Sequence, residues 1–265
     1  MTVPTQTAVR YAVVDGLARL TLDVPDRGNP IDGAFARAMK DIVIDMSERD
    51  DVRAVLITAN GRAFSVGGDI KAFATSRAQL PSIVKAWTVD LHSAIIRLMR
   101  MRAPVVTALT GNVGGGSVSF VAASDIVVAG EGVKLASGFA ALGFSPDTGS
   151  TVSLVQRMGH QRAKRFIMLA EVLDARAAEA AGLVDIVVPA DAVLREAEAI
   201  ATRLAQGPTE AYAGIKRLMM RARTASPETQ MEEEAQTLAA VVRTDDAWEG
   251  ISAFVAKRAP KFRGK

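Results

Sequence analysis

Two glycine-bearing segments carry the residue types of an oxyanion site. The stretch PVVTALTGNVGGGSVSFVAASD (104–125) is uncharged up to its final aspartate and has a glycine triplet, 114–116, near its middle. Its apolar runs predict a buried strand before the glycines and a buried helix after them. The first N–H groups of a helix lack a partner, and glycine lets another group's oxygen approach them closely. The triplet is therefore interpreted as a cradle for an anion or oxyanion.

The shorter segment AFSVGGDI (63–70) repeats this order, with a strand, a glycine pair and a polar helix start. Two such turns in one domain could set two backbone N–H donors on a single oxygen, which is the makeup of an oxyanion hole. The triplet is not followed by the Lys-Ser/Thr of a P-loop and lacks the GxGxxG spacing of a dinucleotide site. Polar residues within 104–125 argue against a membrane span. Tight packing of a helix on a strand remains the structural alternative.

Asp147 is the candidate acid or base. It lies in the loop GFSPDTG (143–149) and is the only carboxylate between Glu131 and Glu171. Because Pro-Asp-Thr-Gly is also favourable turn chemistry, a purely structural role for Asp147 stays open. The second acid of interest, Asp69, has the N-cap of the helix after the glycine pair as its alternative role.

Composition excludes several classes of site. The chain has 265 residues, 49% of them apolar and 23% charged, as in an ordinary soluble globular protein. It has no cysteine, which excludes disulfides and thiolate metal sites. With only His92 and His160, no metal site is expected, and both histidines are interpreted as structural or surface residues. The net charge of +3 is too small to indicate nucleic acid. No secretory signal is visible at the start of the sequence, so a cytoplasmic protein is expected.

The remaining pattern predicts an α/β domain with parallel crossovers. An Asp15-Gly16 pair between two strand-like runs indicates a hairpin, and Asp32 is expected to cap a helix that ends at about residue 48. One long helical region is expected over 71–101. Further strands are expected at 55–58, 105–109, 126–129, 133–135 and 183–188, and further helices at 118–124, 174–182, 191–205, 208–223 and 227–257, the last broken near residue 244.

Five segments in register resemble the crotonase superfamily, the enoyl-CoA hydratases and isomerases. They are RAFSVGGDI, GNVGGGSVSFVAASDI, ALGFSPDTGST, AAEAAGLVDIVVP and EGISAFVAKRAPKF, and they span almost the whole chain. The resemblance implies a crotonase-like (ClpP/crotonase) α/β spiral of ββα units. It implies a core with an acyl-CoA site over 1–200 and a helical C-terminal region for trimerisation over 201–265. The substrate would be an acyl-CoA thioester, the assembly a homotrimer or a hexamer of paired trimers, and no cofactor, metal, nucleic acid or membrane partner is expected.

By this resemblance, the thioester carbonyl lies between the N–H groups of Gly68 and Gly116. The residues expected along the acyl-CoA are Ala63, Ser65, Asp69, Ile70, Phe139 and Lys257.

The two glutamates with which the family's hydratases activate water fall at Ser119 and Phe139, and neither of these residues can act as a base. The loop SPDTGS resembles that of isomerase members, in which an acid follows the proline, and here that acid is Asp147. The resemblance therefore favours an enoyl-CoA isomerase of acyl-CoA or fatty-acid metabolism. A hydratase, another crotonase-type reaction and a non-catalytic acyl-CoA-binding protein remain as alternatives.

Overall fold

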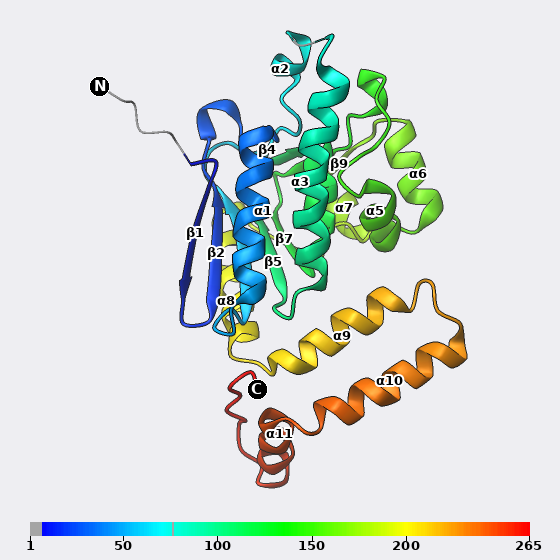
Figure 1. The fold of residues 1–265 in the computed structure, drawn as a ribbon. Coiled ribbons are helices and arrows are strands. Elements are labelled where there is room, and N and C mark those ends of the chain that lie inside the picture. The colour runs from blue at the N-terminus through cyan, green and yellow to red at the C-terminus, as the bar shows by residue number, and fades with distance from the viewer. Residues whose placement is uncertain (1–6, 76) are drawn as a thin grey trace.

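The larger of two β-sheets forms the centre of the fold. The computed structural model describes residues 7–75 and 77–265. Six strands form this sheet in the order β1-β2-β3-β5-β7-β10 (Figure 1). The strands β1 and β2 form the predicted antiparallel hairpin, and the remaining neighbours are parallel. Their bounds are β1 Val9–Val14, β2 Leu17–Leu22, β3 Ala54–Ala59, β5 Val105–Leu109, β7 Ile126–Gly130 and β10 Ile186–Val188.

A second sheet has four short strands in the order β4-β6-β8-β9. The strands are β4 Ala63–Ser65, β6 Asn112–Gly114, β8 Lys134–Ala136 and β9 Val172–Asp174. The chain runs from β3 into β4, from β5 into β6 and from β7 into β8, so each turn of the spiral contributes one strand to each sheet. Because β4 and β6 pair in parallel, the glycine turns that follow them emerge at the same edge. This confirms the crotonase-type α/β fold.

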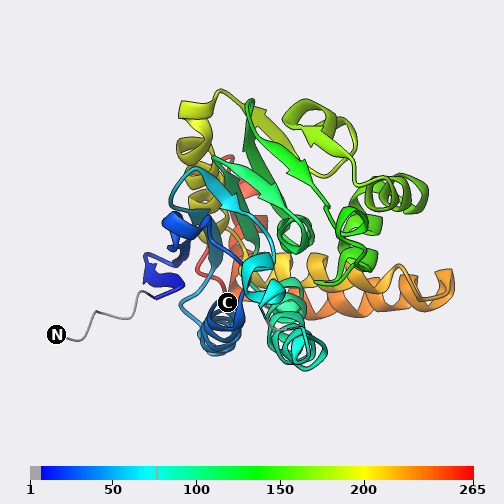
Figure 2. The ribbon, with the colours of Figure 1, turned by 90° about the horizontal axis from the view of Figure 1, so that it is seen from above.

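Helices cover both faces of the main sheet. Helices α1 and α3 lie side by side on one face, and α8 packs on the opposite face against β3, β5 and β7 (Figures 1 and 2). The α-helices are α1 Gly33–Glu48, α2 Ile70–Ala74, α3 Leu80–Arg100, α4 Gly116–Ala122, α5 Ser150–Met158, α6 His160–Met168, α7 Ala175–Ala180, α8 Val193–Ala205, α9 Thr209–Arg221, α10 Pro227–Val241 and α11 Asp245–Val255. Single turns of 3-10 helix lie at Pro25–Arg27, Ala140–Leu142 and Ala190–Ala192.

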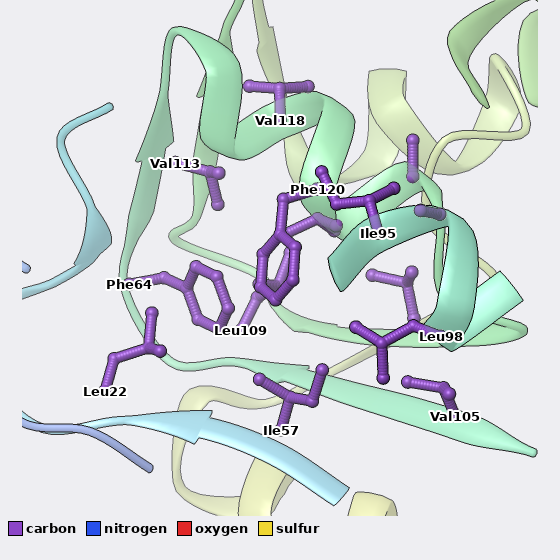
Figure 3. Packing of buried hydrophobic residues seen from close by; sticks show 14 of the residues in the cluster. Leu22, Ile57, Phe64, Ile95, Leu98, Val105, Leu109, Val113, Val118 and Phe120 are labelled. Atoms are coloured by element: carbon purple, nitrogen blue, oxygen red, sulfur yellow. The ribbon is translucent and has the colours of Figure 1, made fainter. Parts of the chain in front are cut away.

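Strand β5 is buried on both faces and divides the core. Val105 and Leu109 point into the larger cluster, with Phe64 of β4 and Phe120 of α4 (Figure 3). Val106 faces the other way, into a smaller cluster below α8. A strand that is buried on both faces has a continuous run of apolar residues. The strand at 105–109 could therefore be predicted although its apolar and polar residues do not alternate.

Two expectations from the sequence were wrong in detail. The helical region 71–101 is two helices, α2 and α3, and residue 76 between them lies outside the described part of the chain. Pro81, in the first turn of α3, is the signal for this break, because proline is tolerated at a helix start. The strand expected at 183–188 is shorter, β10 Ile186–Val188. Between β5 and β6 the chain bends at Gly111 and leads directly into β6. A Cβ built on Gly111 would lie 2.4 Å from the carbonyl oxygen of Arg62, so only glycine fits.

The C-terminal helices α9, α10 and α11 lie below the main body (Figure 1). As predicted, Thr244 separates the last two, and its hydroxyl caps α11 by accepting from the N–H of Ala247. Within the described ranges, no helix is long and apolar enough to cross a bilayer.

Lys216 fastens α9 to the core. Its side chain is only 7% exposed, and its Nζ donates to Asp125 Oδ2 at 2.6 Å, to the carbonyl of Ala103 at 3.0 Å and to that of Leu98 at 3.1 Å. Burial lowers the pKa of Lys216, and the Asp125 carboxylate opposes that shift. Asp125 Oδ2 also accepts from the N–H of Val105 at 2.7 Å, so one carboxylate joins α9 to β5.

Replacing Lys216 with Met should therefore destabilise the fold. The variant leaves two carbonyls and one carboxylate oxygen short of a donor, and we expect the free energy of unfolding to fall by about 1–3 kcal/mol. Lys164→Met on the exposed face of α6 is the control and should change it by less than about 0.5 kcal/mol. Chemical denaturation of both variants measures the difference, and equal midpoints would contradict the anchoring role.

Candidate active site

An apolar cavity of about 560 Å³ opens beside the two glycine turns. Its walls come from the glycine turns, from α2 and α3, and from the segment between β8 and α5. Among the described residues that line it, Asp147 is the only ionisable one. Gly68 and Gly116 line it as well, so the structure brings the predicted acid and both predicted N–H donors to one cavity.

The two glycine turns touch through their backbones. A Cβ built on Gly67 would lie 2.7 Å from the carbonyl oxygen of Gly114, and one built on Gly115 would lie 4.0 Å from the nitrogen of Gly68. Gly67 and Gly115 also have φ values of +86° and +52°, which side chains disfavour. The close backbone approach and the positive φ values both require glycine at these positions. Tight packing and a role in binding an oxyanion, the two interpretations of the glycines, are therefore compatible.

Neither candidate N–H donor has a hydrogen-bond acceptor in the described part of the chain. Over residues 7–75 and 77–265, the N–H groups of Gly68 and Gly116 have no protein acceptor. Gly116 is the first residue of α4, where an unpaired N–H is inherent in helix geometry. Two N–H groups at one cavity wall that lack an acceptor in the described chain are suited to bind one oxygen and to stabilise negative charge that develops on it.

Buried serines hold the first glycine turn in place. Ser65 Oγ donates to the carbonyl of Asn29 at 2.6 Å, and it accepts from the N–H of Gly67 at 3.2 Å. Because a hydroxyl has one hydrogen, Ser117 Oγ must be the donor in its 2.6 Å contact with Ser65 Oγ. Ser65, predicted along the acyl-CoA, is 2% exposed and joins the two glycine segments behind the cavity.

Asp147 is half-buried in the loop before α5, and its neighbours fix its position. Thr148 Oγ1 donates to Asp147 Oδ1 at 2.7 Å, and the Asp147 carbonyl accepts from Ser150 Oγ and from the N–H of Ser150. Ser119 Oγ donates in turn to Ser150 Oγ, because the single hydrogen of Ser150 is already engaged. Ser119, where the resemblance places a hydratase glutamate, is buried and supports the loop of the acid through Ser150.

Thr148 is the strained residue of the site. It is 1% exposed, and its φ is +55°, in the left-handed region that costs a β-branched residue about 1–3 kcal/mol. Its N–H donates to Nε2 of His92, on α3, at 3.1 Å. The sequence interpretation of His92 missed this contact, because nothing local to α3 indicates that the loop 56 residues later reaches it.

Aromatic rings form part of the cavity wall, and Phe73 lies beside Gly68. The ring centroids of Phe73 and Trp87 are 5.4 Å apart, and those of Phe73 and Phe144 are 6.4 Å apart. Phe139 and Ile70, both predicted to contact the acyl-CoA, line the same cavity. The cavity is therefore suited to an apolar acyl group with one polar end at the glycine turns.

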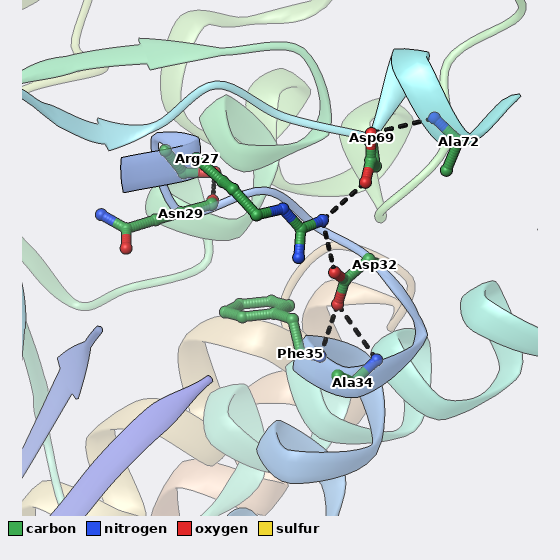
Figure 4. A network of polar contacts seen from close by, with 8 residues as sticks. Arg27, Asn29, Asp32, Ala34, Phe35, Asp69 and Ala72 are labelled. Atoms are coloured by element: carbon green, nitrogen blue, oxygen red, sulfur yellow. Dashed lines mark hydrogen bonds and ion pairs between the residues drawn. The ribbon is translucent and has the colours of Figure 1, made fainter. Parts of the chain in front are cut away.

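Arg27 joins the two helix starts beside the glycine turn. Its Nη2 contacts Asp32 Oδ2 at 2.9 Å and Asp69 Oδ2 at 2.6 Å (Figure 4). The other oxygen of each carboxylate caps a helix, since Asp32 Oδ1 accepts from Phe35 N–H and Asp69 Oδ1 from the α2 backbone. The N-cap role that the sequence left open for Asp69 is confirmed, and it fixes the residue directly after Gly68.

Four of the predicted contact residues lie outside the described cavity lining: Ser65 and Asp69, whose structural roles are given above, and also Ala63 and Lys257. Ala63 lies in β4, where it pairs with Asn112 of β6. Lys257 is exposed just after α11. Neither belongs to the cavity lining found within the described chain, so their contact with acyl-CoA remains a prediction.

Known proteins share this sequence and fold. Residues 13–265 match the enoyl-CoA hydratase/isomerase family. The trans-2-decenoyl-[acyl-carrier-protein] isomerase of Streptococcus mutans is 30% identical, over 97% of this chain and 98% of its own length. The 1,2-epoxyphenylacetyl-CoA isomerase of Escherichia coli is 30% identical, over 96% and 97%. An enoyl-CoA hydratase structure from Polaromonas sp. JS666 superposes with a TM-score of 0.90 at 27% identity, over 96% of this chain and 99% of its own.

The chain belongs to the enoyl-CoA hydratase/isomerase family, within the crotonase superfamily. This confirms the resemblance drawn from the five sequence segments. The similar proteins include both isomerases and hydratases, so the family alone does not fix the reaction.

Gly116→Ala tests the packing between the donor turn and the acid. The new Cβ would lie 2.5 Å from Thr148 Oγ1 and 3.2 Å from Asp147 Oδ1, so overpacking should lower the free energy of unfolding by about 1–3 kcal/mol. Gly68→Ala is matched, because it also keeps its N–H but meets only Phe73, at 3.4 Å, and should cost under about 1 kcal/mol. Thermal unfolding of both variants gives the comparison. Equal losses would contradict the close contact at Gly116.

Proposed function

We propose that this protein is an enoyl-CoA isomerase that shifts a double bond through a thioester enolate. The observation that carries the proposal is that Asp147 is the one carboxylate among the described lining residues of a cavity to which Gly68 and Gly116 also belong, and that the N–H groups of these glycines have no acceptor in the described chain. Isomerisation needs one base that removes a proton at one carbon and returns it two carbons away. It also needs fixed donors for the enolate oxygen. A cofactor other than the coenzyme A of the substrate is not required for this step.

The proposed reaction begins with a 3-enoyl-CoA whose thioester oxygen accepts from both glycine N–H groups. Asp147 removes a proton from C2, the electron pair delocalises onto the thioester oxygen, and the two donors stabilise the resulting dienolate. The protonated Asp147 then returns the proton to C4, and the double bond moves to C2–C3. Asp147 Oδ1 is held by Thr148, which leaves Oδ2 for the proton transfer.

Hydration is the second candidate, because hydratases are among the proteins of the same fold. It would require groups that position and activate water at the two positions where the family's hydratases carry glutamates. Here Phe139 lines the cavity and Ser119 is buried behind Asp147, so the walls offer no second carboxylate among the described residues. We therefore propose that hydration is slow or absent.

Asp147→Asn should separate the candidates. The amide keeps the shape and the turn but cannot accept the proton, so isomerisation of 3-enoyl-CoA should fall by about 100-fold or more while acyl-CoA binding persists. Formation of the conjugated thioester, followed by its ultraviolet absorbance, gives the rate, and calorimetry gives the binding. Asp174→Asn is the control and should keep the activity, because Asp174 caps α7 and lies outside the described cavity lining.

Three results would contradict the proposal. Unchanged isomerisation by Asp147→Asn would mean that the base is elsewhere. Rapid loss of absorbance when wild type receives 2-enoyl-CoA would favour a hydratase. Tight acyl-CoA binding with no turnover of either substrate would favour a non-catalytic binding protein.

We also propose that the chain works as a trimer or as a pair of trimers. Large apolar side chains project from α10 and α11 into solvent, among them Phe254 at 86% exposure and Trp248 at 62%. In a monomer this apolar surface would be exposed to solvent, whereas contact with other copies of the chain would bury it.

Phe254→Glu should weaken this assembly, because it sets a charge in the expected contact. Light scattering should give three or six chains for wild type and a smaller mass for the variant. Val89→Glu on α3, at a side chain of 69% exposure, is the matched control and should leave the mass unchanged. A monomeric wild type at micromolar concentration would refute the proposal.

A further inference from the structure

His92 and Thr148 form a relay of contacts that ends at the proposed base. The Thr148 N–H donates to His92 Nε2 at 3.1 Å, and Thr148 Oγ1 donates to Asp147 Oδ1 at 2.7 Å. His92 lies on α3 next to Leu91, which lines the cavity, but His92 itself is not part of the lining. It is therefore placed to act on Asp147 only through Thr148.

The direction of the first contact fixes the chemistry of the imidazole. A backbone N–H can only donate, so His92 Nε2 must be an unprotonated acceptor. The imidazole is then neutral, with its hydrogen on Nδ1. A side chain without an acceptor at this point would leave the Thr148 N–H unpaired at a residue that is 1% exposed.

The second contact explains why the backbone of Thr148 matters for the acid. Thr148 adopts a φ of +55°, which its own side chain disfavours, and it persists only because its surroundings hold it. In this conformation the backbone N–H reaches α3 while the hydroxyl reaches the carboxylate of the preceding residue. Release of the N–H would free Thr148 to leave the left-handed region and to withdraw its hydroxyl from Asp147.

We propose that His92 is a positioning residue for the proton-transfer step. It holds Thr148 in the left-handed conformation, Thr148 fixes Oδ1 of Asp147, and Oδ2 is thereby directed to the substrate. This inference rests on the proposed isomerase function for the role of Asp147, whereas the link between His92 and Thr148 stands on the geometry alone. The predicted consequence is specific to the catalytic rate, because His92 lies outside the described cavity lining, to which Gly68 and Gly116 belong.

Three variants test the relay. His92→Gln places an amide oxygen near the position of Nε2 and keeps the acceptor, whereas His92→Leu removes it. His160→Leu is the matched control, because His160 is also an exposed histidine on a helix, whereas the Thr148 N–H donates to His92. A thermal unfolding curve for each variant establishes that it is folded.

The kinetic readout is the isomerisation of 3-enoyl-CoA. His92→Leu should lower kcat by about 10- to 100-fold, the size expected for a small misplacement of a reacting group. Its KM should stay within about threefold of wild type, because substrate binding is untouched. His92→Gln should recover most of kcat, and His160→Leu should match wild type. A kcat for His92→Leu equal to wild type, or a kcat for His92→Gln as low as that of His92→Leu, would overturn the proposal.

Hydrogen exchange gives a readout that does not depend on activity. In mass spectrometry of peptides that span 143–149, exchange should be faster in His92→Leu than in wild type and close to wild type in His92→Gln. Equal exchange in all variants would overturn the link between His92 and Thr148. If wild type isomerises no 3-enoyl-CoA, the proposed function fails, and the exchange pattern still decides whether His92 holds this loop.

Discussion

The backbone contact between the two glycine turns is the constraint on which the rest of the structure depends. The carbonyl of Gly114 lies so close to Gly67 that no side chain fits between them, and this proximity brings the nitrogen of Gly68 beside Gly115. Such an approach requires two parallel strands that end together, and β4 and β6 supply them. The second sheet, though made of very short strands, thus sets the distance between the two candidate donors.

Buried hydroxyl groups next to these turns form hydrogen bonds that hold the turns in place. Polar groups that would otherwise be unpaired are used to join segments, as Ser65 and Ser117 do between the glycine turns. A similar chain of hydroxyls, from Ser119 through Ser150, supports the loop of the acid. Buried hydrogen bonds of this kind hold groups in place because leaving any of them unmade is costly. The cavity itself remains apolar apart from its two N–H donors, the carboxylate of Asp147 and a few hydroxyls.

Local sequence signals were sufficient for most of the elements, though not for α5 and α6, and for the composition of the site. The hairpin at Asp15-Gly16, the cap at Asp32 and the break at Thr244 follow from turn and capping chemistry, and the structure has all three. The glycine segments and Asp147 stood out by residue type, and they do meet at one cavity. Two strands of the second sheet, β4 and β8, were expected from the sequence, whereas β6 and β9 were missed because strands of three residues carry no usable periodicity.

Long-range polar contacts could not be predicted in the same way. His92 and Thr148 are 56 positions apart, and neither residue has a local pattern that selects the other as its partner. Lys216 looked like any surface lysine of an amphipathic helix, yet the packing of α9 against the end of α3 buries it beside Asp125. Only the three-dimensional arrangement decides which of many similar polar residues are enclosed.

The corner at Gly111 has a consequence for how such proteins diversify. Because the chain must turn there from one sheet into the other, the strand that leads to the donors is set by backbone geometry and not by any side chain near the substrate. The walls that face the acyl group, formed by residues such as Phe139 and Trp87, can therefore change identity while the donors stay where they are. Substitutions at the cavity walls alone can then adapt the same fold to another acyl group or to another reaction. The N–H groups that polarise the substrate carbonyl keep their positions.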